Sequence, residues 1–321
     1  MTDTSLELKL EPAADTLRAW ALDEDLKRTV LANPALAAAA GRIARRYTAG
    51  ETVDQAIDAA RAGTRRGHTA SIDYVGESIR DAATARRETD VFLRLIEAVR
   101  AADVPATISF DLSHVGSLVD RDLGLAHARE LAAATADLGT ALVISAEGSD
   151  RTDLVLDLHE ALSAEFDHVG ITLQARLHRT PQDLRRVLRH PGPVRLVKGA
   201  FLEPESVAYR RDSAELTSAY LAQTAELLDA RHPVFLATHD DELVRTLRER
   251  HGAALTEPGV EFEMLLGLGT ELLDQLHGEG FNTREYLIFG DEWWLYVLNR
   301  IAEDPTRVIT ALADLRPAPG V

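Results

Sequence analysis

The sequence contains no cysteine. Disulfides, thiolate nucleophiles, cysteine-ligated zinc, iron–sulfur clusters and cysteinyl cofactor links are therefore excluded. No apolar run reaches the roughly 18 residues that a membrane span needs. The polar, acidic start MTDTSLELKL lacks the basic and apolar regions of a signal peptide. We therefore expect a cytoplasmic protein in a reducing compartment, with no transmembrane segment.

Positive charge is also scarce. The chain has 35 Lys and Arg against 52 Asp and Glu, which gives a formal net charge of −17 at pH 7. So acidic a surface repels phosphate backbones, and we expect no nucleic-acid partner. It also argues against a stable polybasic attachment to lipid. A peripheral place on the inner face of the membrane is the closest association with a bilayer that we expect.

The first part of the chain has the periodicity of helices. TLRAWALDEDLKRTVL carries apolar residues at helical spacing, PALAAAAGRIARRY begins with a proline suited to a first helical turn, and DQAIDAARAGTRRG ends at glycine. These patterns predict three short helices in an N-terminal helical segment, residues 1–69. Such a segment covers the rest of the molecule or mediates contacts in a homo-oligomer.

Beyond residue 70, short apolar runs alternate with stretches of helical periodicity. The runs are SIDYVG (71–76), PATISFDL (105–112), TALVISAEG (140–148), VGITLQA (169–175), PVRLVKGA (193–200), PVFLATHD (233–240), VEFEMLLG (260–267) and TREYLIFG (283–290). Eight strands alternating with helices over about 250 residues are typical of a (β/α)₈ barrel. We therefore predict an α/β fold with a TIM barrel over residues 70–321. A doubly wound open sheet is the alternative.

Polar residues stand at the ends of these runs. They are Asp111, Glu147, Gln174, Lys198, Thr238 with His239, and Tyr286. In a barrel the carboxyl ends of the strands form the functional mouth, so these side chains should meet there. The sequence shows no dinucleotide-binding fingerprint, no P-loop and no H-E-x-x-H. We expect no metal site.

The stretch RLVKGAF (195–201) carries two cations in a strand-like segment. Lys198 could form a Schiff base, as in a class I aldolase. Arg195 and Lys198 could instead hold an anionic cofactor, or both side chains could simply reach solvent. Neutral hydrogen-bonding residues at other strand ends, such as Gln174 and the ATHD stretch, fit a large cofactor better than a small aldol substrate.

Seven stretches together carry a family resemblance. They are SIDYVGES, SAEGSDR, VGITLQARLHRTPQDL, RLVKGAF with LEPESVA after it, FLATHD, EFEMLLG and REYLIFGDEWWLYVLNRIAEDP. In this order and spacing the chain resembles the proline dehydrogenase family. These are monofunctional flavoenzymes with a distorted (β/α)₈ barrel that hold FAD non-covalently. The resemblance covers roughly residues 70–315.

The resemblance implies roles for individual residues. Positions that match cofactor contacts are Gln174, Arg195, Lys198, Thr238, His239 and Glu303. Leu265 matches an apolar substrate contact, Tyr286 a tyrosine beside the substrate, and Arg300 a cation that holds the substrate carboxylate. Arg195, Tyr286 and Arg300 are thereby the expected catalytic residues. A cation beside the isoalloxazine N5, as implied for Arg195, stabilises the electron density of reduced flavin.

The chain departs from the family at the substrate side. Asp111 stands where the family has a lysine, and Asn299 where it has the first of two adjacent arginines. Phe201 replaces a tyrosine, and Ser145 an aspartate. The changes at Asp111 and Asn299 make the predicted pocket three charges more negative. Since one unpaired charge at about 4 Å is worth roughly 4 kcal/mol at an effective dielectric of about 20, ordinary proline should bind poorly.

We therefore predict a divergent member of the family with an altered substrate pocket, in which Asp111, Phe201, Leu265, Tyr286, Asn299 and Arg300 contact the substrate. It would oxidise a C–N bond of a modified or non-proline amino acid or amine by hydride transfer to FAD, and pass the electrons to a quinone or to oxygen. Three alternatives remain: ordinary oxidation of L-proline to pyrroline-5-carboxylate, a Schiff-base aldolase that uses Lys198, and a flavin-binding sensor without catalysis.

Overall fold

A computed structural model describes residues 4–76, 79 and 81–315. Glu77 and Ser78 of the SIDYVGES motif lie outside the described residues, as do Arg80 and residues 1–3 and 316–321 at the ends of the two predicted segments. The strands are β1 Thr69–Tyr74, β2 Ala106–Phe110, β3 Leu142–Ile144, β4 Val169–Gln174, β5 Val194–Val197, β6 Val234–Ala237, β7 Val260–Leu265 and β8 Thr283–Phe289.

Helices alternate with these strands. They are α1 Thr4–Ala21, α2 Glu24–Ala32, α3 Pro34–Tyr47, α4 Val53–Arg65, α5 Ala82–Ala102, α6 Arg121–Thr135, α7 Thr152–Ser163, α8 Thr180–Val187, α9 Ala214–Asp229, α10 Asp241–His251, α11 Thr270–Gly278, α12 Trp293–Glu303 and α13 Arg307–Asp314. Short 3₁₀ turns precede α7 and follow α10. No helix of the described ranges is both long enough and apolar enough to cross a membrane.

The strands close into a barrel. They run parallel in chain order, and β8 pairs with β1 to complete the ring. Every predicted apolar run overlaps one of these strands, and only β1 begins before its run, by two residues. The predicted barrel is therefore confirmed and the open-sheet alternative is wrong. The outward-facing strand residues, such as Ile72, Ile108, Leu196 and Phe262, are fully buried against the surrounding helices.

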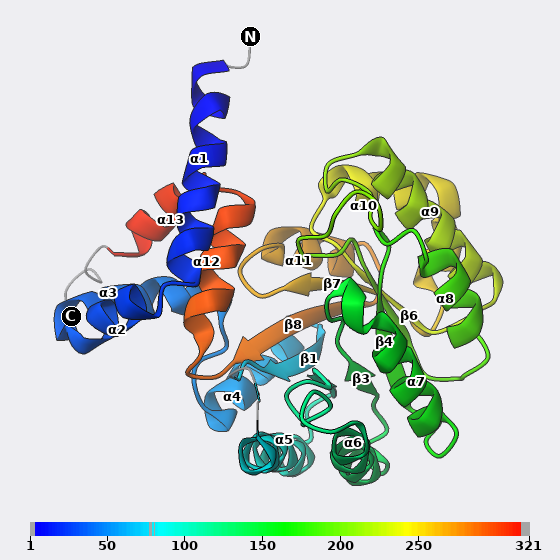
Figure 1. Cartoon of the computed structure of the whole chain (residues 1–321). Coiled ribbons are helices and arrows are strands. Elements are labelled where there is room, and N and C mark those ends of the chain that lie inside the picture. Colours follow the sequence, from blue (N-terminus) through cyan, green and yellow to red (C-terminus); the bar gives the residue numbers. More distant parts are fainter. Residues whose placement is uncertain (1–3, 77–78, 80, 316–321) are drawn as a thin grey trace.

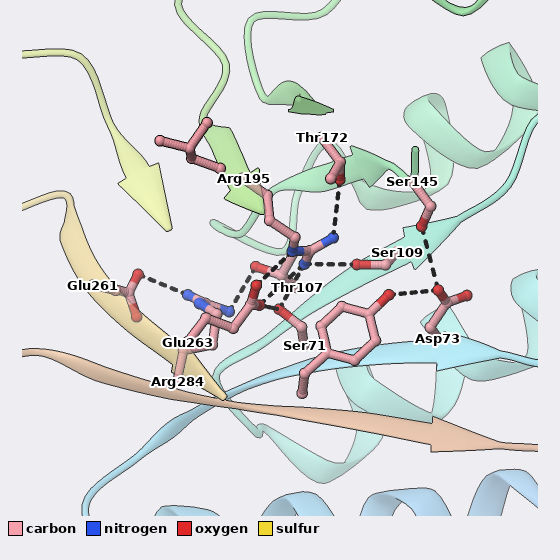
Figure 2. A network of polar contacts seen from close by, with 12 residues as sticks. Ser71, Asp73, Thr107, Ser109, Ser145, Thr172, Arg195, Glu261, Glu263 and Arg284 are labelled. Atoms are coloured by element: carbon pink, nitrogen blue, oxygen red, sulfur yellow. Dashed lines mark hydrogen bonds and ion pairs between the residues drawn. The ribbon is translucent and has the colours of Figure 1, made fainter. Parts of the chain in front are cut away.

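The inward-facing residues of the same strands are largely polar. Because strand side chains alternate between the two faces, the neighbours of the apolar outward residues point at the barrel axis. Figure 2 shows Ser71, Ser109, Thr172, Arg195 and Glu263 gathered there. The barrel is therefore held by an apolar layer outside the strands and carries a hydrogen-bonded polar layer inside them.

The N-terminal segment differs from the prediction in one respect. The predicted first helix, residues 16–31, is wrong as a single helix because the chain breaks between α1 and α2. Asp23 causes the break: its side chain accepts a hydrogen bond from the Leu26 N–H and caps α2. Four helices therefore precede β1 in the described part of the chain, where three were predicted.

The last of these helices, α4, is part of the outer layer of the barrel. It contacts β8 and β1 and buries a face made of small residues, which include Ala56, Ala60 and Gly63. A Cβ at Gly63 would lie 3.1 Å from Glu285 Oε2, so glycine allows the close approach. The predicted division at residues 69 and 70 stays a prediction, although α4 packs on the barrel beyond that boundary.

A second apolar cluster joins the two ends of the chain. Leu17 of α1 and Tyr47 of α3 pack with Trp293, Trp294 and Val297 of α12. Figure 1 shows α1, α2, α3, α12 and α13 gathered on one side of the barrel. The helix that follows β8 is thus packed against the N-terminal helices, and this packing fixes its position beside the barrel mouth.

We predict that Leu17→Ala destabilises this cluster. Leu17 is 8% exposed, so its truncation leaves a cavity, and the free energy of unfolding should fall by about 2 to 3 kcal/mol. Urea unfolding and protease resistance of α1 would measure the effect. Leu22→Ala is the control, because Leu22 is 74% exposed and should change little. Equal effects of the two variants would contradict the packing of α1 on α12.

Candidate active site

A cavity of about 510 Å³ opens at the carboxyl ends of the strands. All the predicted cofactor and substrate residues line it except Asp111 and Asn299. Those that line it are Gln174, Arg195, Lys198, Phe201, Thr238, His239, Leu265, Tyr286, Arg300 and Glu303. The structure thus brings these residues to one place, and their roles toward a ligand stay predictions.

Arg195 lies at the floor of the cavity and is 3% exposed. Its Nε donates to Glu263 Oε2 at 2.5 Å, and its Nη2 donates to the hydroxyls of Ser71 and Ser109 at 3.0 and 2.9 Å. The Tyr286 ring lies 4.6 Å from the guanidinium carbon. Burial works against the charge, but the facing Glu263 carboxylate raises the pKa of Arg195 above its ordinary value. The position therefore carries a fixed positive charge.

Above Arg195, Tyr286 donates its hydroxyl proton to Asp73 Oδ2 at 2.5 Å. Ser145 donates to the same oxygen at 3.3 Å. Burial and the neighbouring carboxylate of Asp111 raise the pKa of Asp73 to about 7. Burial and Asp73 in turn raise the pKa of Tyr286 well above its ordinary value. Tyr286 is consequently a neutral hydrogen-bond donor, and Asp73 titrates near neutral pH.

Asp111 lies behind Asp73, and the Ser145 hydroxyl is placed between the two carboxyl groups. Burial raises the pKa of Asp111, while His114 nearby opposes that shift. The His114 Nε2 atom is 3.8 Å from Asp111 Oδ2. Asp111 therefore acts on the cavity through Asp73 rather than from its wall.

Two of the predicted cofactor residues, Gln174 and Lys198, line the wall at the ends of β4 and β5. Gln174 is 4% exposed and its Nε2 donates to the Glu147 carbonyl, while its buried Oε1 has no partner within the described residues. Gly199 has φ +112°, and a Cβ there would come within 2.7 Å of the Arg176 side chain and 3.1 Å of Gln174 Oε1. Lys198 Nζ donates to Asp240 Oδ2 at 2.5 Å. A buried acceptor and a glycine cradle are features of a wall that receives a polar ligand.

His239 at the end of β6 is an uncharged ring. Burial and the positive charge of Arg300 lower the pKa of His239 to about 4. Its Nε2 accepts a hydrogen bond from the Leu265 N–H at 3.3 Å, so the proton of the neutral ring is on Nδ1. His239 thus offers one N–H donor, next to the buried Thr238.

Several residues of the cavity wall escaped the sequence prediction. Arg18 of α1, Arg211 of the segment between β5 and α9, and Tyr296 of α12 all line it. Burial lowers the pKa of Arg211, and the positive charges of Arg176, Arg18 and Arg300 lower it further. Arg18 and Arg211 follow no strand, so the strand-end rule could not find them. Asp73 lies inside the predicted run SIDYVG and one residue before the end of β1, so the strand-end rule passed over it as well.

A family model described as proline dehydrogenase matches residues 56–303. Over 271 residues the chain is 35% identical to "Proline dehydrogenase" from Deinococcus radiodurans, covering 82% of this chain and 86% of that protein. Over 276 residues it is 29% identical to "Proline dehydrogenase 1" from Bacillus subtilis, covering 85% of this chain and 90% of that protein.

Solved structures show the same fold. A proline utilization A (PutA) structure from Bdellovibrio bacteriovorus, inactivated by N-propargylglycine, matches with a TM-score of 0.77 at 17% identity, over 98% of this chain and 39% of that chain. A mutant PutA from Bradyrhizobium japonicum matches with a TM-score of 0.68 at 26% identity, over 84% of this chain and 33% of that chain. This chain therefore spans well under half of those longer proteins.

We predict that Glu263→Gln strongly destabilises the barrel. Glu263 is 1% exposed, and its loss leaves the buried guanidinium of Arg195 without a counter-charge, which typically costs about 3 to 5 kcal/mol. Urea unfolding of the cofactor-free protein would measure the change. Glu242→Gln removes a surface partner of Arg245 and should have little effect. A similar small change in both variants would contradict the structural importance of the buried pair.

Proposed function

Because the chain belongs to the proline dehydrogenase family, flavin-dependent oxidoreductases that act on CH–NH donors, we propose that it oxidises L-proline to pyrroline-5-carboxylate with FAD as bound cofactor. The cavity over Arg195 is the observation that carries the proposal, since ten residues that match the family's cofactor and substrate positions line it. The modified substrate predicted from the sequence finds no support in the relatives.

The residues of the cavity fit a flavin. Gln174 Oε1 is a buried acceptor for a ring N–H and has no partner in the part of the chain that the structure describes. His239 has an Nδ1–H donor, and Lys198 is a cation at the same wall. Thr238 and Glu303 complete the set that would hold the cofactor. When bound, FAD supplies a two-electron acceptor that takes a hydride from the carbon next to nitrogen. Arg195 would stabilise negative charge at that place because its own charge is fixed.

The carboxylate of proline would bind to the arginines of the wall. Arg300 lies on α12, and its Nη2 contacts Glu303 Oε1 at 2.8 Å, while its buried Nε has no partner within the described residues. Arg211 and Arg18 add positive charge to the same cavity. Asp111, which the sequence placed against the substrate, does not line the cavity. The wall therefore offers more positive charge to an anionic substrate than the aligned positions predicted.

A Schiff-base aldolase and a flavin sensor without catalysis both fit the cavity less well. The aldolase needs a free, desolvated amine, whereas Lys198 Nζ is paired with Asp240 Oδ2. The sensor needs no substrate groups, whereas Tyr286, Arg300 and Leu265 all line the cavity. The electron acceptor, a quinone or oxygen, stays a prediction, as does assembly into a homo-oligomer.

We predict that the purified chain, supplied with FAD, shows a flavin absorbance spectrum that L-proline bleaches under anaerobic conditions. An artificial electron acceptor should restore the colour, and mass spectrometry should identify pyrroline-5-carboxylate. D-Proline and a panel of other amines serve as controls. A protein that binds no FAD, or one that other amines bleach while L-proline does not, would overturn the proposal.

We predict that Arg300→Gln raises the KM for L-proline roughly 10- to 100-fold, because a charged hydrogen bond to the carboxylate is worth about 1.5 to 3 kcal/mol. Pyrrolidine lacks the carboxylate, so its KM should change little. The exposed Arg129→Gln is the matched control, since Arg129 pairs with Glu165 away from the cavity. An equal rise for both amines would contradict a role of Arg300 in binding the carboxylate.

A further inference from the structure

The proposed reaction requires a proton acceptor, and neither the residues that would hold the flavin nor those that would bind the carboxylate fill that role. A secondary alkyl amine has a pKa of about 10, so at pH 7 the substrate arrives as an ammonium ion. Hydride can leave the neighbouring carbon only when the nitrogen lone pair is free to form the C=N bond. A group in the cavity wall must therefore remove a proton from nitrogen, or the enzyme must wait for the rare neutral amine.

Asp73 is the carboxyl group at the right place. Its side chain lines the cavity, one strand position beyond Ile72, and it is half-buried rather than sealed off. Both hydrogen bonds that it accepts within the described residues, from Tyr286 and from Ser145, reach Oδ2. Oδ1 thus keeps its lone pairs for a ligand. Tyr286 contacts both groups: its hydroxyl donates to Asp73 and its ring lies against the Arg195 guanidinium. The Tyr286 side chain therefore stands between Asp73 and Arg195, the predicted flavin contact.

The surroundings give Asp73 the proton affinity of a base that works near neutral pH. Besides Tyr286, the titratable or charged groups that act on it are Asp111 and His114 from the segment after β2, Arg195 from β5, and Tyr296 from α12. Burial and Asp111 raise the pKa of Asp73 to about 7, against the opposing effects of Tyr286, His114 and Arg195. A base with a pKa near the working pH is both largely ionised and able to hold a proton.

We propose, on the basis of the proposed function, that Asp73 is a catalytic residue that accepts the ammonium proton of the substrate. The N–H bond breaks, its electron pair stays on nitrogen, and the proton forms an O–H bond at Asp73 Oδ1. The adjacent C–H bond then breaks, its two electrons leave with hydrogen as hydride to the bound flavin, and the nitrogen lone pair forms the C=N bond. The product leaves as the protonated imine, which still carries the second N–H of the ammonium and loses that proton to water. Solvent then takes the first proton from Asp73.

Asp111 has a separate, supporting part in this proposal. It stands where the resemblance implies a lysine, and its carboxylate raises the proton affinity of Asp73 where an ammonium would lower it. Asp111 is therefore a positioning residue that sets the pH range of Asp73 without touching the substrate. Asp111 in place of lysine first suggested a different substrate. In this proposal it changes the proton affinity of Asp73 and leaves the binding site of the substrate carboxylate unchanged.

The test is the pH dependence of kcat/KM for L-proline between pH 5.5 and 9, in the FAD-loaded protein and in Asp73→Asn. In the wild type kcat/KM should rise to about pH 7 and then level off. In Asp73→Asn it should fall roughly 100- to 1000-fold at pH 7, because general base catalysis is lost. It should then rise about tenfold per pH unit up to pH 9, as the neutral amine becomes more abundant.

The same variant excludes the kinetically equivalent mechanism. A protonated Asp73 acting on the neutral amine would give the same wild-type profile, but asparagine resembles a protonated carboxyl group. Asp73→Asn would then keep the wild-type rate at pH 6, and that result would overturn the proposal. Asp167→Asn, an exposed change at the opposite end of the barrel, is the matched control and should reproduce the wild-type profile.

A ligand without the proton separates base catalysis from a loss of structure. Tetrahydrofuran-2-carboxylate carries a ring oxygen in place of the N–H, so it has nothing to give to Asp73. Its inhibition constant, read from the change in flavin absorbance, should stay the same or fall in Asp73→Asn, while the KM for L-proline rises. Weaker binding of both ligands would indicate a damaged pocket and overturn the assignment.

Asp111→Asn tests the tuning. Removal of the neighbouring charge should move the rise of kcat/KM to lower pH by roughly one unit. An unchanged midpoint would contradict the part given to Asp111.

The cofactor-free protein gives a readout without turnover. The pKa of Asp73 is about 4 in the unfolded chain and about 7 in the folded chain, so between these pH values the folded chain binds more protons. The stability that protonated Asp73 contributes is therefore lost as pH rises from about 4 to about 7. In urea unfolding, Asp73→Asn should therefore gain stability relative to wild type from pH 5 to pH 8. Parallel curves would contradict the raised proton affinity.

A wild type that does not oxidise L-proline would overturn the proposed function, whereas an active wild type with an unchanged Asp73→Asn profile would overturn only the role of Asp73.

Discussion

The buried ion pair of Arg195 and Glu263 on the barrel axis is the interaction around which the site is built. Removing two charges from water costs several kcal/mol for each ion, and their mutual attraction offsets this only when the remaining donors and lone pairs are satisfied. The strands meet that demand with the hydroxyls of Ser71 and Ser109, and with Thr172 Oγ1 at 3.4 Å from Arg195 Nη1. The guanidinium is thereby fixed in position and charge, as stabilisation of a developing negative charge requires.

The same period of two that buries the apolar face of each strand arranges the polar interior in layers. The Phe235 ring lies against both Arg195 and a second arginine, Arg284. Arg284 Nη2 donates to Glu261 at 2.8 Å (Figure 2). Above Arg195 lies Tyr286 with Asp73. A one-residue slip of any strand would turn its charged side chains into the apolar outer layer. The geometry of the site therefore depends on the register of the barrel strands.

The sequence predicts the parts of this structure that depend on local pattern. Apolar runs of strand length identify all eight strands, and the rule that strand ends form the mouth brings Gln174, Lys198 and Tyr286 together. The break at Asp23 was missed because helical periodicity continues across a cap. Arg18 and Arg211 were missed for another reason: they reach the cavity through the packing of α1 on α12 and the course of a long connection, and neither is encoded in local spacing.

The substrate side shows why formal charges read from a sequence do not simply add. The comparison of aligned positions assumes that each carboxyl group is ionised and that each charge faces the ligand. Here burial raises the pKa of both Asp73 and Asp111. The pKa of Asp73 rises to about 7, so this carboxyl group holds a proton for part of the time near neutral pH. Arg18 and Arg211 supply positive charge from positions outside the comparison. Two neighbouring carboxyl groups that cannot easily both ionise are thus better regarded as a place to hold a proton than as a barrier to an anionic substrate.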